Sequence, residues 1–308
     1  MAMPATRVRL IAPSGYPRDR AAVARGVARL HEAGCTLDGL GVLDRVEQRY
    51  AGSDAERADD INALATLDVL PDIALAIRGG YGATRLLEHL HYDALRERLA
   101  GASTLLVGHS DFTAIQLALH AKCALVTFGG PMFDPDFDAE VLSGLTLPHF
   151  WRTVRSAQGH AEWNSSGEHA LDVEGPLWGG NLAMLCSLLG TPYFPRIDGG
   201  ILFVEDVGEP PYRIERLLYQ LHLSGVLGRQ RALVLGDFTE CRHGIHDNGY
   251  DLAAAQAQIR RVISIPVLDG LPFGHVPDKL TLPFGVPARL RADGAKARLD
   301  FSGYPHLA

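Results

Sequence analysis

The first half of the 308-residue chain alternates short apolar runs with segments of helical periodicity. The apolar runs end in turn residues: V-R-L-I-A-P-S-G, I-A-L-A-I-R-G-G, T-L-L-V-G and A-L-V-T-F-G-G-P. Helical spacing predicts helices over Asp19 to His31, Asp54 to Leu67, Ala83 to Leu90 and Asp111 to His120. Strands that alternate with helices favour an α/β domain with a parallel sheet, whose sites form beyond the carboxyl ends of the strands.

The second half contains more strands and fewer helices. G-I-L-F-V, A-L-V-L-G and R-V-I-S-I-P-V-L predict strands, A-R-L-R-A and A-R-L-D-F a terminal hairpin, and Asn181 to Leu189 and Tyr212 to Leu223 helices. Between about Phe150 and Pro176 the periodicity is weak. We therefore expect three parts: an N-terminal domain over 1–150 with an open parallel sheet in a flavodoxin-like arrangement, a linker over 151–176, and a smaller, β-rich α/β domain over 177–308.

Composition and charge exclude several classes of protein. Lys and Arg total 29 against 36 Asp and Glu, a net charge of −7, and no basic run is long enough to follow a phosphate backbone, so we expect no nucleic-acid partner. No stretch approaches the ~18 apolar residues of a membrane span, and Arg9 and the following prolines exclude a signal segment near the N-terminus. Four widely spaced cysteines predict reduced, mostly buried thiols in a cytoplasmic protein: Cys35, Cys123, Cys186 and Cys241.

The segment Gly108-His109-Ser110-Asp111 lies where a predicted buried strand turns into a helix. A serine at such a turn places its hydroxyl above the sheet, beside the first N–H groups of the helix, as in a nucleophile elbow. Phe112 stands where the G-x-S-x-G pattern of α/β-hydrolases has its second glycine, so that fold is not favoured. A serine that caps the helix explains the motif equally well.

The glycine-rich segment I-R-G-G-Y-G ends the preceding strand. Glycines there allow backbone N–H groups to approach a ligand closely. Gly79 or Gly80 can supply one donor of an oxyanion hole, with the N–H of Asp111 as the other. A plain glycine turn is the alternative, and the segment lacks the spacing of a phosphate-binding loop.

Three carboxylates follow the strand G-I-L-F-V within five residues: Glu205, Asp206 and Glu209. They can serve as metal ligands, as acid–base groups or as a solvated turn that caps the next helix. Glu205 directly follows the apolar run, which makes it the least suited of the three to free solvation.

Histidines provide two further candidates. His275, on a glycine- and proline-rich loop, is a candidate general base because an imidazole titrates near neutral pH. Cys241, His243 and His246 form C-x-H-x-x-H, a possible metal pattern without an evident fourth ligand, for which exposed polar loop residues are the simpler interpretation.

Six motifs occur in order between roughly residues 75 and 285: R-G-G-Y-G, G-H-S-D, W-G-G-N-L, F-V-E-D-V-G-E-P-P-Y-R-I-E-R-L-L, G-D-F-T-E-C and F-G-H-x-x-D-K-x-T-L-P-F-G. This series closely resembles the LD-carboxypeptidase family, the muramoyltetrapeptide carboxypeptidases of bacterial cell-wall recycling. The resemblance extends to the N-terminal A-P-S-G turn and so spans nearly the whole chain. One departure is Asp278, where many relatives have Asn; this position is not a triad member.

The resemblance implies a serine peptidase with a Ser-His-Glu triad and no metal or organic cofactor. Carried onto this chain, Ser110 is the nucleophile, Glu205 the acid and His275 the base. The N-terminal domain then contributes the nucleophile, and the C-terminal domain the other two. The implied oxyanion donors are the backbone N–H groups of Asp111 and Gly80.

The family also implies the substrate, a murein tetrapeptide or muropeptide that loses its terminal D-alanine. An arginine is the natural partner of the free carboxylate, and Arg78 and Arg213 are candidates, with Gly79 and Tyr81 as further substrate-binding residues. Relatives suggest a homodimer, and neither nucleic acid nor a membrane is expected as a partner.

Three alternatives remain open. One is a microcin-immunity-type peptidase that cleaves an acyl-sulfamoyl-adenylate toxin, although the chain shows no inserted aromatic loop. The second is a non-catalytic peptide-binding relative, against which the intact Ser110, Glu205 and His275 argue. The third is a metal-dependent hydrolase that uses Cys241, His243 and His246.

Overall fold

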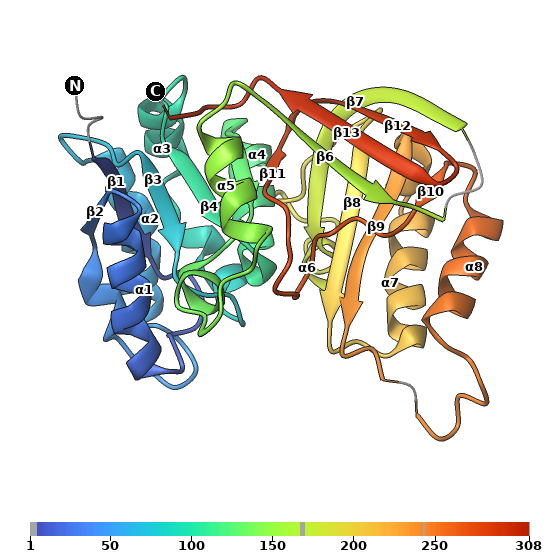
Figure 1. The fold of residues 1–308 in the computed structure, drawn as a ribbon, viewed down its shortest axis with the longest axis horizontal. Coiled ribbons are helices and arrows are strands. Elements are labelled where there is room, and N and C mark those ends of the chain that lie inside the picture. The colour runs from blue at the N-terminus through green and yellow to red at the C-terminus, as the bar shows by residue number, and fades with distance from the viewer. Residues whose placement is uncertain (1–4, 167–169, 243, 308) are drawn as a thin grey trace.

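The chain forms two sheets with helices packed on their faces (Figure 1). The computed structural model describes residues 5–166, 170–242 and 244–307. In Figure 1 the first sheet lies on the left, in blue and green apart from the red strand β11, and the second lies on the right, in yellow-green, yellow, orange and red. Within the described residues, no helix is long and apolar enough to cross a bilayer.

The first sheet has the strand order β11-β5-β4-β3-β1-β2. All neighbours pair in parallel except β11, which runs antiparallel to β5. The parallel order 2-1-3-4-5 is the flavodoxin-like arrangement that the sequence predicted. Its strands are β1 (Thr6–Ile11), β2 (Cys35–Asp38), β3 (Ile73–Ala76), β4 (Leu105–Gly108), β5 (Thr127–Gly129) and β11 (Leu282–Phe284).

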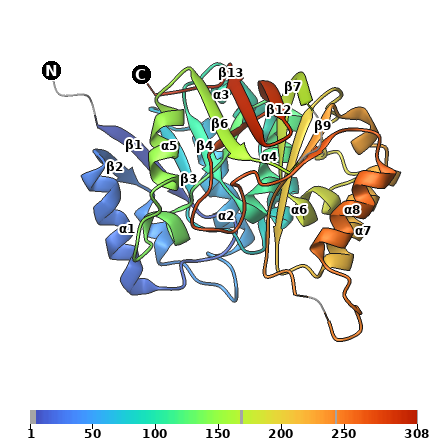
Figure 2. The ribbon, with the colours of Figure 1, turned by 45° about the vertical axis from the view of Figure 1, so that its right-hand side comes forward.

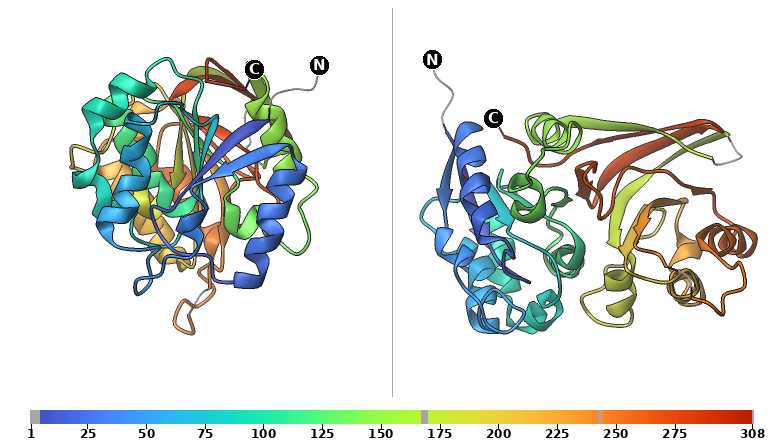
Figure 3. Two further views of the ribbon diagram at one scale, coloured as in Figure 1. Left: turned by 90° about the vertical axis from the view of Figure 1, so that its left-hand side faces the viewer. Right: turned by 60° about the horizontal axis from the view of Figure 1, so that its bottom comes forward.

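Helices cover both faces of this sheet (Figure 3, left). One face packs against α1 (Arg20–Glu32) and α5 (Thr146–Val154). The other packs against α2 (Asp54–Asn62), α3 (Tyr92–Leu99) and α4 (Thr113–Cys123). Short 3-10 or π turns complete this half: η1 (Leu40–Leu43), η2 (Ala63–Ala65), η3 (Ala83–His89), η4 (Ser110–Phe112) and η5 (Phe133–Phe137). The predicted helix over Ala83 to Leu90 is thus a 3-10 segment.

The second sheet has the order β10-β9-β8-β7-β12-β13-β6, parallel from β7 to β10 and antiparallel from β7 to β6. The predicted terminal hairpin is its β12–β13 pair. The strands are β6 (Gln158–Asn164), β7 (Ala170–Asn181), β8 (Ile201–Val207), β9 (Ala232–Thr239), β10 (Val267–Leu268), β12 (Val286–Asp293) and β13 (Lys296–Ser302). The helices are α6 (Leu182–Ser187), η6 (Leu227–Arg229), α7 (Pro211–Leu223) and α8 (Leu252–Val262), with α7 and α8 together on the outside (Figure 2).

The stretch 151–176 is not a linker, which corrects the sequence-based expectation. It holds the end of α5, all of β6 and the first half of β7, and both strands belong to the second sheet (Figure 3, right). The sequence signal is weak because β6 buries only Ala161 and Trp163 and its other residues are polar or glycine. Two alternating apolar positions are too few to mark a strand. The domain limits 1–150 and 177–308 stay a prediction.

A second correction concerns the predicted strand R-V-I-S-I-P-V-L. Its first residues end α8, and only Val267–Leu268 pair as β10. The alanine-rich sequence before it favours a helix, and Asp251 caps that helix by accepting a hydrogen bond from the N–H of Ala254. The apolar run therefore divides between a helix end and a short edge strand.

One continuous apolar core joins the two halves. It extends from α2, α3 and α4 through Trp178 to α6, α7 and α8. The segment that follows the loop after β10 also returns to the first sheet as β11. Buried contacts on both sides of the junction therefore fix the position of one sheet relative to the other.

Close backbone approach between β7 and β8 predicts a strong glycine requirement at position 179. A Cβ there would lie 1.8 Å from the carbonyl oxygen of Phe203, and the backbone φ is +144°. We expect Gly179→Ala to lower the free energy of unfolding by at least about 2 kcal/mol in urea titrations followed by circular dichroism. Gly41→Ala is the control, because nothing lies within 4 Å of its added Cβ. Equal stability of both variants would contradict the expectation.

Candidate active site

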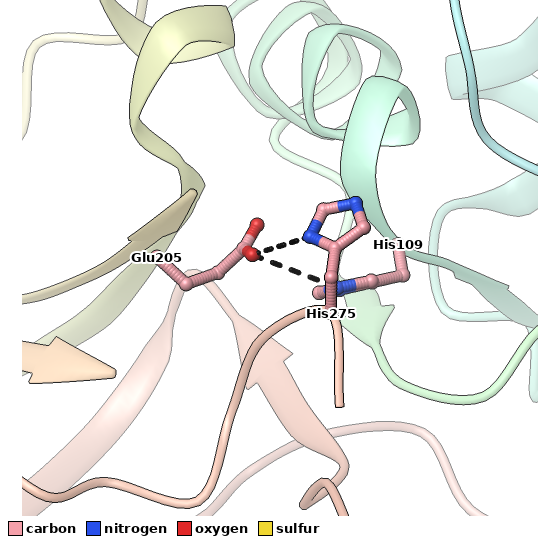
Figure 4. Close-up of side chains that lie close together, drawn as sticks. All are labelled: His109, Glu205 and His275. Atoms are coloured by element: carbon pink, nitrogen blue, oxygen red, sulfur yellow. Dashed lines mark hydrogen bonds and ion pairs between the residues drawn. The ribbon is translucent and has the colours of Figure 1, made fainter. Parts of the chain in front are cut away.

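Three predicted residues from distant parts of the chain meet in one hydrogen-bonded row. Ser110 follows β4, Glu205 lies in β8, and His275 lies in the loop between β10 and β11. The distance from Ser110 Oγ to His275 Nε2 is 2.8 Å, and that from His275 Nδ1 to Glu205 Oε2 is 2.7 Å. Figure 4 shows the imidazole of His275 beside the Glu205 carboxylate. This row has the geometry of a nucleophile, a base and an orienting acid.

The backbone at Ser110 is held in an unusual conformation. Its φ is +62°, a left-handed value that non-glycine residues rarely adopt. Ser110 is the first residue of η4 and His109 is its N-cap, while the Ser110 hydroxyl bonds to His275, so the helix-cap interpretation of the motif is wrong. A Cβ on Gly79 would lie 2.8 Å from the Cβ of Ser110, and one on Gly108 would lie 2.3 Å from the ring of Phe112. Glycines are therefore required at these two positions, and the buried Phe112 ring occupies the space over Gly108.

Glu205 and Asp206 are neighbours with different surroundings. Glu205 is fully buried and accepts hydrogen bonds from His275 and from Asn181 Nδ2, the latter at 3.3 Å. Asp206 instead accepts from Asn181 Nδ2 and from the backbone N–H groups of Ala183 and Val207, each at 2.9 Å. Burial, followed by the charge of Glu205, raises the pKa of Asp206 to about 6. Successive strand residues point to opposite faces, so only Glu205 faces the imidazole of His275.

His109, which the sequence analysis did not single out, packs against this row. It is 2% exposed, its ring centroid lies 4.8 Å from that of His275, and its Nε2 lies 3.9 Å from Glu205 Oε2. Phe273 covers the ring edge-on at 5.0 Å. Burial, and then the charges of His275 and Lys279, hold the pKa of His109 well below its usual range, so the ring is neutral. The only sequence signal was its place in the G-H-S-D motif.

The side chain of Asp111 links three loops of the first sheet. It is buried, and its Oδ2 accepts hydrogen bonds from Ser14 Oγ at 2.6 Å and from the N–H of Ala83 at 2.8 Å. Ser14 follows β1 and Ala83 follows the glycine loop after β3. Burial raises the pKa of this carboxyl group. The sequence analysis used only the backbone N–H of Asp111 and missed the role of its side chain and of Ser14.

The other predicted binding residues lie on two different loops. Arg78 is largely buried, with its Nε 3.3 Å from Asp134 Oδ2, and it precedes the loop in which Gly80 has a φ of +111°. Tyr81 is exposed on the same loop, under the guanidinium of Arg49. Arg213 lies on α7 and pairs with Glu209 at 2.8 Å. Arg78, Gly79 and Tyr81 therefore lie close together because they are near neighbours in the sequence. Arg213 lies on a different element, α7.

A cavity of 290 Å³ opens beside the row. Its lining includes His109, His275, Met132, Pro135 and Val276. Lys279 also lines it, in a buried ion pair with Asp136 Oδ1 at 2.6 Å. A larger hollow of 920 Å³ lies between α5 and strands β6, β7, β12 and β13, and it contains none of the predicted site residues.

Metal-ligating side chains gather at one place in the described ranges. His109, Glu205 and His275 have ligand atoms within 4.8 Å of one another. Of the C-x-H-x-x-H pattern, Cys241 is partly buried, His246 is exposed and His243 lies outside the described residues. All four cysteines are free, and Cys35, Cys123 and Cys186 are buried as predicted.

Comparison with known proteins decides the family. Residues 8–130 match the model of the LD-carboxypeptidase N-terminal domain, and residues 174–290 match that of the LD-carboxypeptidase C-terminal domain. The chain belongs to the LD-carboxypeptidase family. This confirms the resemblance drawn from the motifs.

The similarity to known relatives extends over most of the chain. A putative carboxypeptidase of Streptomyces coelicolor is 36% identical over 96% of this chain and 94% of its own. The crystal structure of muramoyltetrapeptide carboxypeptidase from Oxalobacter formigenes superposes with a TM-score of 0.90 at 44% identity, covering 97% of this chain and 100% of that one. The microcin C7 self-immunity protein of Escherichia coli is 30% identical over 87% of this chain and 85% of its own.

The carboxyl group of Asp138, in the loop beside this site, predicts a pH effect on stability. The side chain is buried, and burial followed by the charge of Asp134 raises its pKa to about 7. The folded state therefore binds a proton more tightly than the unfolded chain, so wild-type stability falls as pH rises from about 4 to about 7. The Asp138→Asn variant should not show this loss of stability, because its amide does not titrate.

In urea titrations, we expect the stability of Asp138→Asn relative to wild type to rise between pH 5 and pH 7 by up to about 1.4 kcal/mol per pH unit. The range from pH 8 to pH 9 is the internal control, because there the difference should be constant. A difference that is the same at pH 5 and pH 8 would show that this carboxyl group does not titrate differently in the folded state.

Proposed function

We propose that this protein is a serine carboxypeptidase that releases terminal D-alanine from murein tetrapeptides. The bond cut is the amide between D-alanine and the L-centre of meso-diaminopimelate or a similar residue. The observation that supports this most directly is the row from Ser110 Oγ through His275 to the buried Glu205. The muramoyltetrapeptide carboxypeptidase of Oxalobacter formigenes supplies the substrate class.

In the proposed reaction, Ser110 Oγ attacks the scissile carbonyl while His275 Nε2 takes its proton. His275 then protonates the departing amine of D-alanine, which leaves an acyl-enzyme. In the second half, water attacks the ester, His275 accepts the proton of that water and returns it to Ser110. Glu205 holds the Nδ1–H tautomer of His275 and stabilises the imidazolium in both halves.

The developing oxyanion needs preorganised donors, and the proposed ones are the N–H groups of Asp111 and Gly80. The Asp111 carboxylate supports this arrangement, because it bonds to the loop after β3 through Ala83 and to the loop after β1 through Ser14. The closeness of Gly79 to Ser110 brings the same loop against the nucleophile. These contacts hold the loops that carry the proposed donors beside Ser110.

For the terminal carboxylate, Arg78 is the better of the two candidates. It immediately precedes Gly79, which lies against Ser110, and its guanidinium is largely shielded from water, where an ion pair is strengthened. Arg213 is half exposed, and it pairs with Glu209, which lies just before α7. We propose Arg78 as the carboxylate partner, with Gly79 and Tyr81 on the same loop.

We further propose that the enzyme acts in the cytoplasm, in peptidoglycan recycling, as a homodimer. The free, mostly buried thiols support the cytoplasmic placement. The homodimer is inferred from the family resemblance, and light scattering after size exclusion tests it: a mass near 33 kDa would exclude it, since the chain itself is 33.3 kDa.

A second candidate function is cleavage of an acyl-sulfamoyl-adenylate. The observation that favours it is the 30% identity with the microcin C7 self-immunity protein over most of both chains. The same triad would perform the acyl transfer, so only the preferred substrate distinguishes the two. Both substrates therefore belong in the assay below.

Replacement of the nucleophile provides the primary test. With a tetrapeptide ending in D-alanine and EDTA present, wild type should release one D-alanine, and Ser110→Ala should be slower by at least about 10³-fold, because the attacking oxygen is gone. Mass spectrometry of the products measures both. Thr113→Ser is the control variant, because it keeps a hydroxyl on the same turn.

Three outcomes decide against parts of the proposal. Equal cleavage by wild type and Ser110→Ala would overturn the triad. Cleavage of the sulfamoyl-adenylate alone would select the second candidate function. Binding of the tetrapeptide without cleavage of either substrate would select a non-catalytic peptide-binding role.

The two neighbouring carboxylates provide a matched comparison. Glu205→Gln should lower kcat by about 10³–10⁴-fold, because the amide cannot stabilise the imidazolium of His275. Asp206→Asn should lower it by less than about 10-fold, because Asp206 bonds to Asn181, Ala183 and Val207 and not to the imidazole. Steady-state rates with the tetrapeptide measure both, and the reverse order would assign the acid to Asp206.

The arginine assignment predicts an effect on substrate binding. Arg78→Lys keeps the charge but loses the planar fork, and it should raise KM for the tetrapeptide by about 10-fold or more. Arg213→Lys is the matched control and should leave KM within about 2-fold. A larger effect at Arg213 would transfer the carboxylate site to α7.

A further inference from the structure

We propose that His109, Glu205 and His275 bind one divalent transition-metal ion of the zinc class, and that this ion inhibits the enzyme. The donors are His109 Nε2, Glu205 Oε2 and His275 Nδ1. The inhibition rests on the proposed function, whereas the metal site itself does not. The site is distinct from the metal-dependent hydrolase considered above, because here the ion blocks the chemistry and does not perform it.

The three donor atoms are already close together. One ligand atom from each residue lies within 4.8 Å of the other two, and Glu205 Oε2 lies 3.9 Å from His109 Nε2 and 2.7 Å from His275 Nδ1. Zinc bonds to nitrogen and oxygen at about 2.0–2.1 Å, so tetrahedral donors lie roughly 3.3 Å apart. The Glu205–His109 separation must shorten by about 0.6 Å and the Glu205–His275 separation must lengthen by about 0.6 Å to reach that spacing. Two imidazoles and a glutamate also form a donor set that zinc sites use.

His109 has a nitrogen without a protein partner. Its ring hydrogen-bonds to the backbone of Gly274, while Nε2 is buried and has no hydrogen-bond partner among the described residues. A buried polar atom in this state is costly. A backbone bond on the other ring nitrogen is the arrangement that fixes the tautomer of a metal-ligating histidine. Nε2 of His109 is therefore oriented as a ligand beside the Glu205 carboxylate (Figure 4).

An ion can reach these atoms from the adjacent cavity. The cavity is lined by both histidines, and its volume of 290 Å³ leaves room for water as a fourth ligand. The cation that faces this region is Lys279, and its charge is neutralised by Asp136 in the buried ion pair. Glu205 supplies the negative charge of the site, and Asp206 and Asp237 are the neighbouring carboxyl groups.

Metal binding would disable the base without covering the nucleophile. When the ion bonds to His275 Nδ1, the Nδ1 proton leaves and the ring takes a proton on Nε2, so the imidazole remains neutral and no net proton is released. Nε2–H then donates toward Ser110 Oγ and cannot accept its proton. The expected inhibition therefore lowers kcat and leaves KM unchanged.

Metal binding is measured first, without substrate. The full-length, metal-free protein is titrated with ZnCl₂ by calorimetry, and with CoCl₂ by visible absorption for the bands of a tetrahedral site. We expect one ion per chain in wild type. His109→Phe keeps an aromatic ring in place but removes one ligand, and it should weaken binding by roughly 100-fold or more, since loss of even an outer partner costs 10–100-fold.

The control variant is Cys241→Ala/His246→Ala, which removes the two described residues of the C-x-H-x-x-H pattern and should bind as wild type does. If His109→Phe does not fold, His109→Gln replaces it, with thermal unfolding as the check. Binding that survives at His109→Phe or disappears in the control variant would overturn the site. Absence of one-to-one binding by wild type would do the same.

Inhibition is measured second, with each variant compared with its own metal-free rate. Zinc should lower kcat for the tetrapeptide by at least about 10-fold in wild type at saturation, with full recovery on adding EDTA, and much less in His109→Phe at the same concentration. If zinc binds through His109 but no variant cleaves the peptide, the proposed function fails and the metal site stands. If wild type cleaves and zinc binds but does not inhibit, the inhibitory role is excluded.

Discussion

The hydrogen bond between the Glu205 carboxylate and His275 Nδ1 is the interaction on which the site depends. Glu205 is fully buried, and an ionised carboxylate without partners is costly in such surroundings. His275 and Asn181 provide those partners. The same bond fixes the ring so that its other nitrogen meets Ser110 at 2.8 Å. One buried contact therefore provides a partner for a carboxylate of the second sheet and aligns the imidazole of His275 with a serine of the first.

This alignment requires the two sheets to be held at a constant distance. The start of α4 meets the end of β7, where the backbone N–H of Asn181 donates to Thr113 Oγ1 at 3.1 Å. A Cβ on Gly180 would lie 2.5 Å from that oxygen, so a larger residue would push the sheets apart. The continuous apolar core on one side and strand β11 on the other complete the junction. Rigid packing of this kind suits the proposed triad, whose members come from both halves.

Buried polar groups surround the row, and most of their polar atoms have structural partners. Asp111 binds the loops after β1 and β3, Asp206 binds the start of α6, and Lys279 pairs with Asp136. Among the described residues of this group, His109 Nε2 and Asp111 Oδ1 have no hydrogen-bond partner. The place of His109 beside Glu205 follows from the same strand-to-helix turn that sets the conformation of Ser110, because His109 and Ser110 are adjacent.

The sequence by itself determined that strands and helices alternate in the first half and that the strands form a parallel sheet. It also identified the motifs that contain Ser110, Glu205 and His275. These signals are local: apolar periodicity marks buried elements, and glycines mark the turns at strand ends. It could not determine that 151–176 forms strands, because half-buried strands with few apolar residues resemble loops. Nor could it choose between a nucleophilic and a capping Ser110, or between Glu205 and Asp206, on the residues alone. Only the tertiary structure decided which side chains meet, because opposite faces of a strand and distant loops are related by packing and not by spacing along the chain.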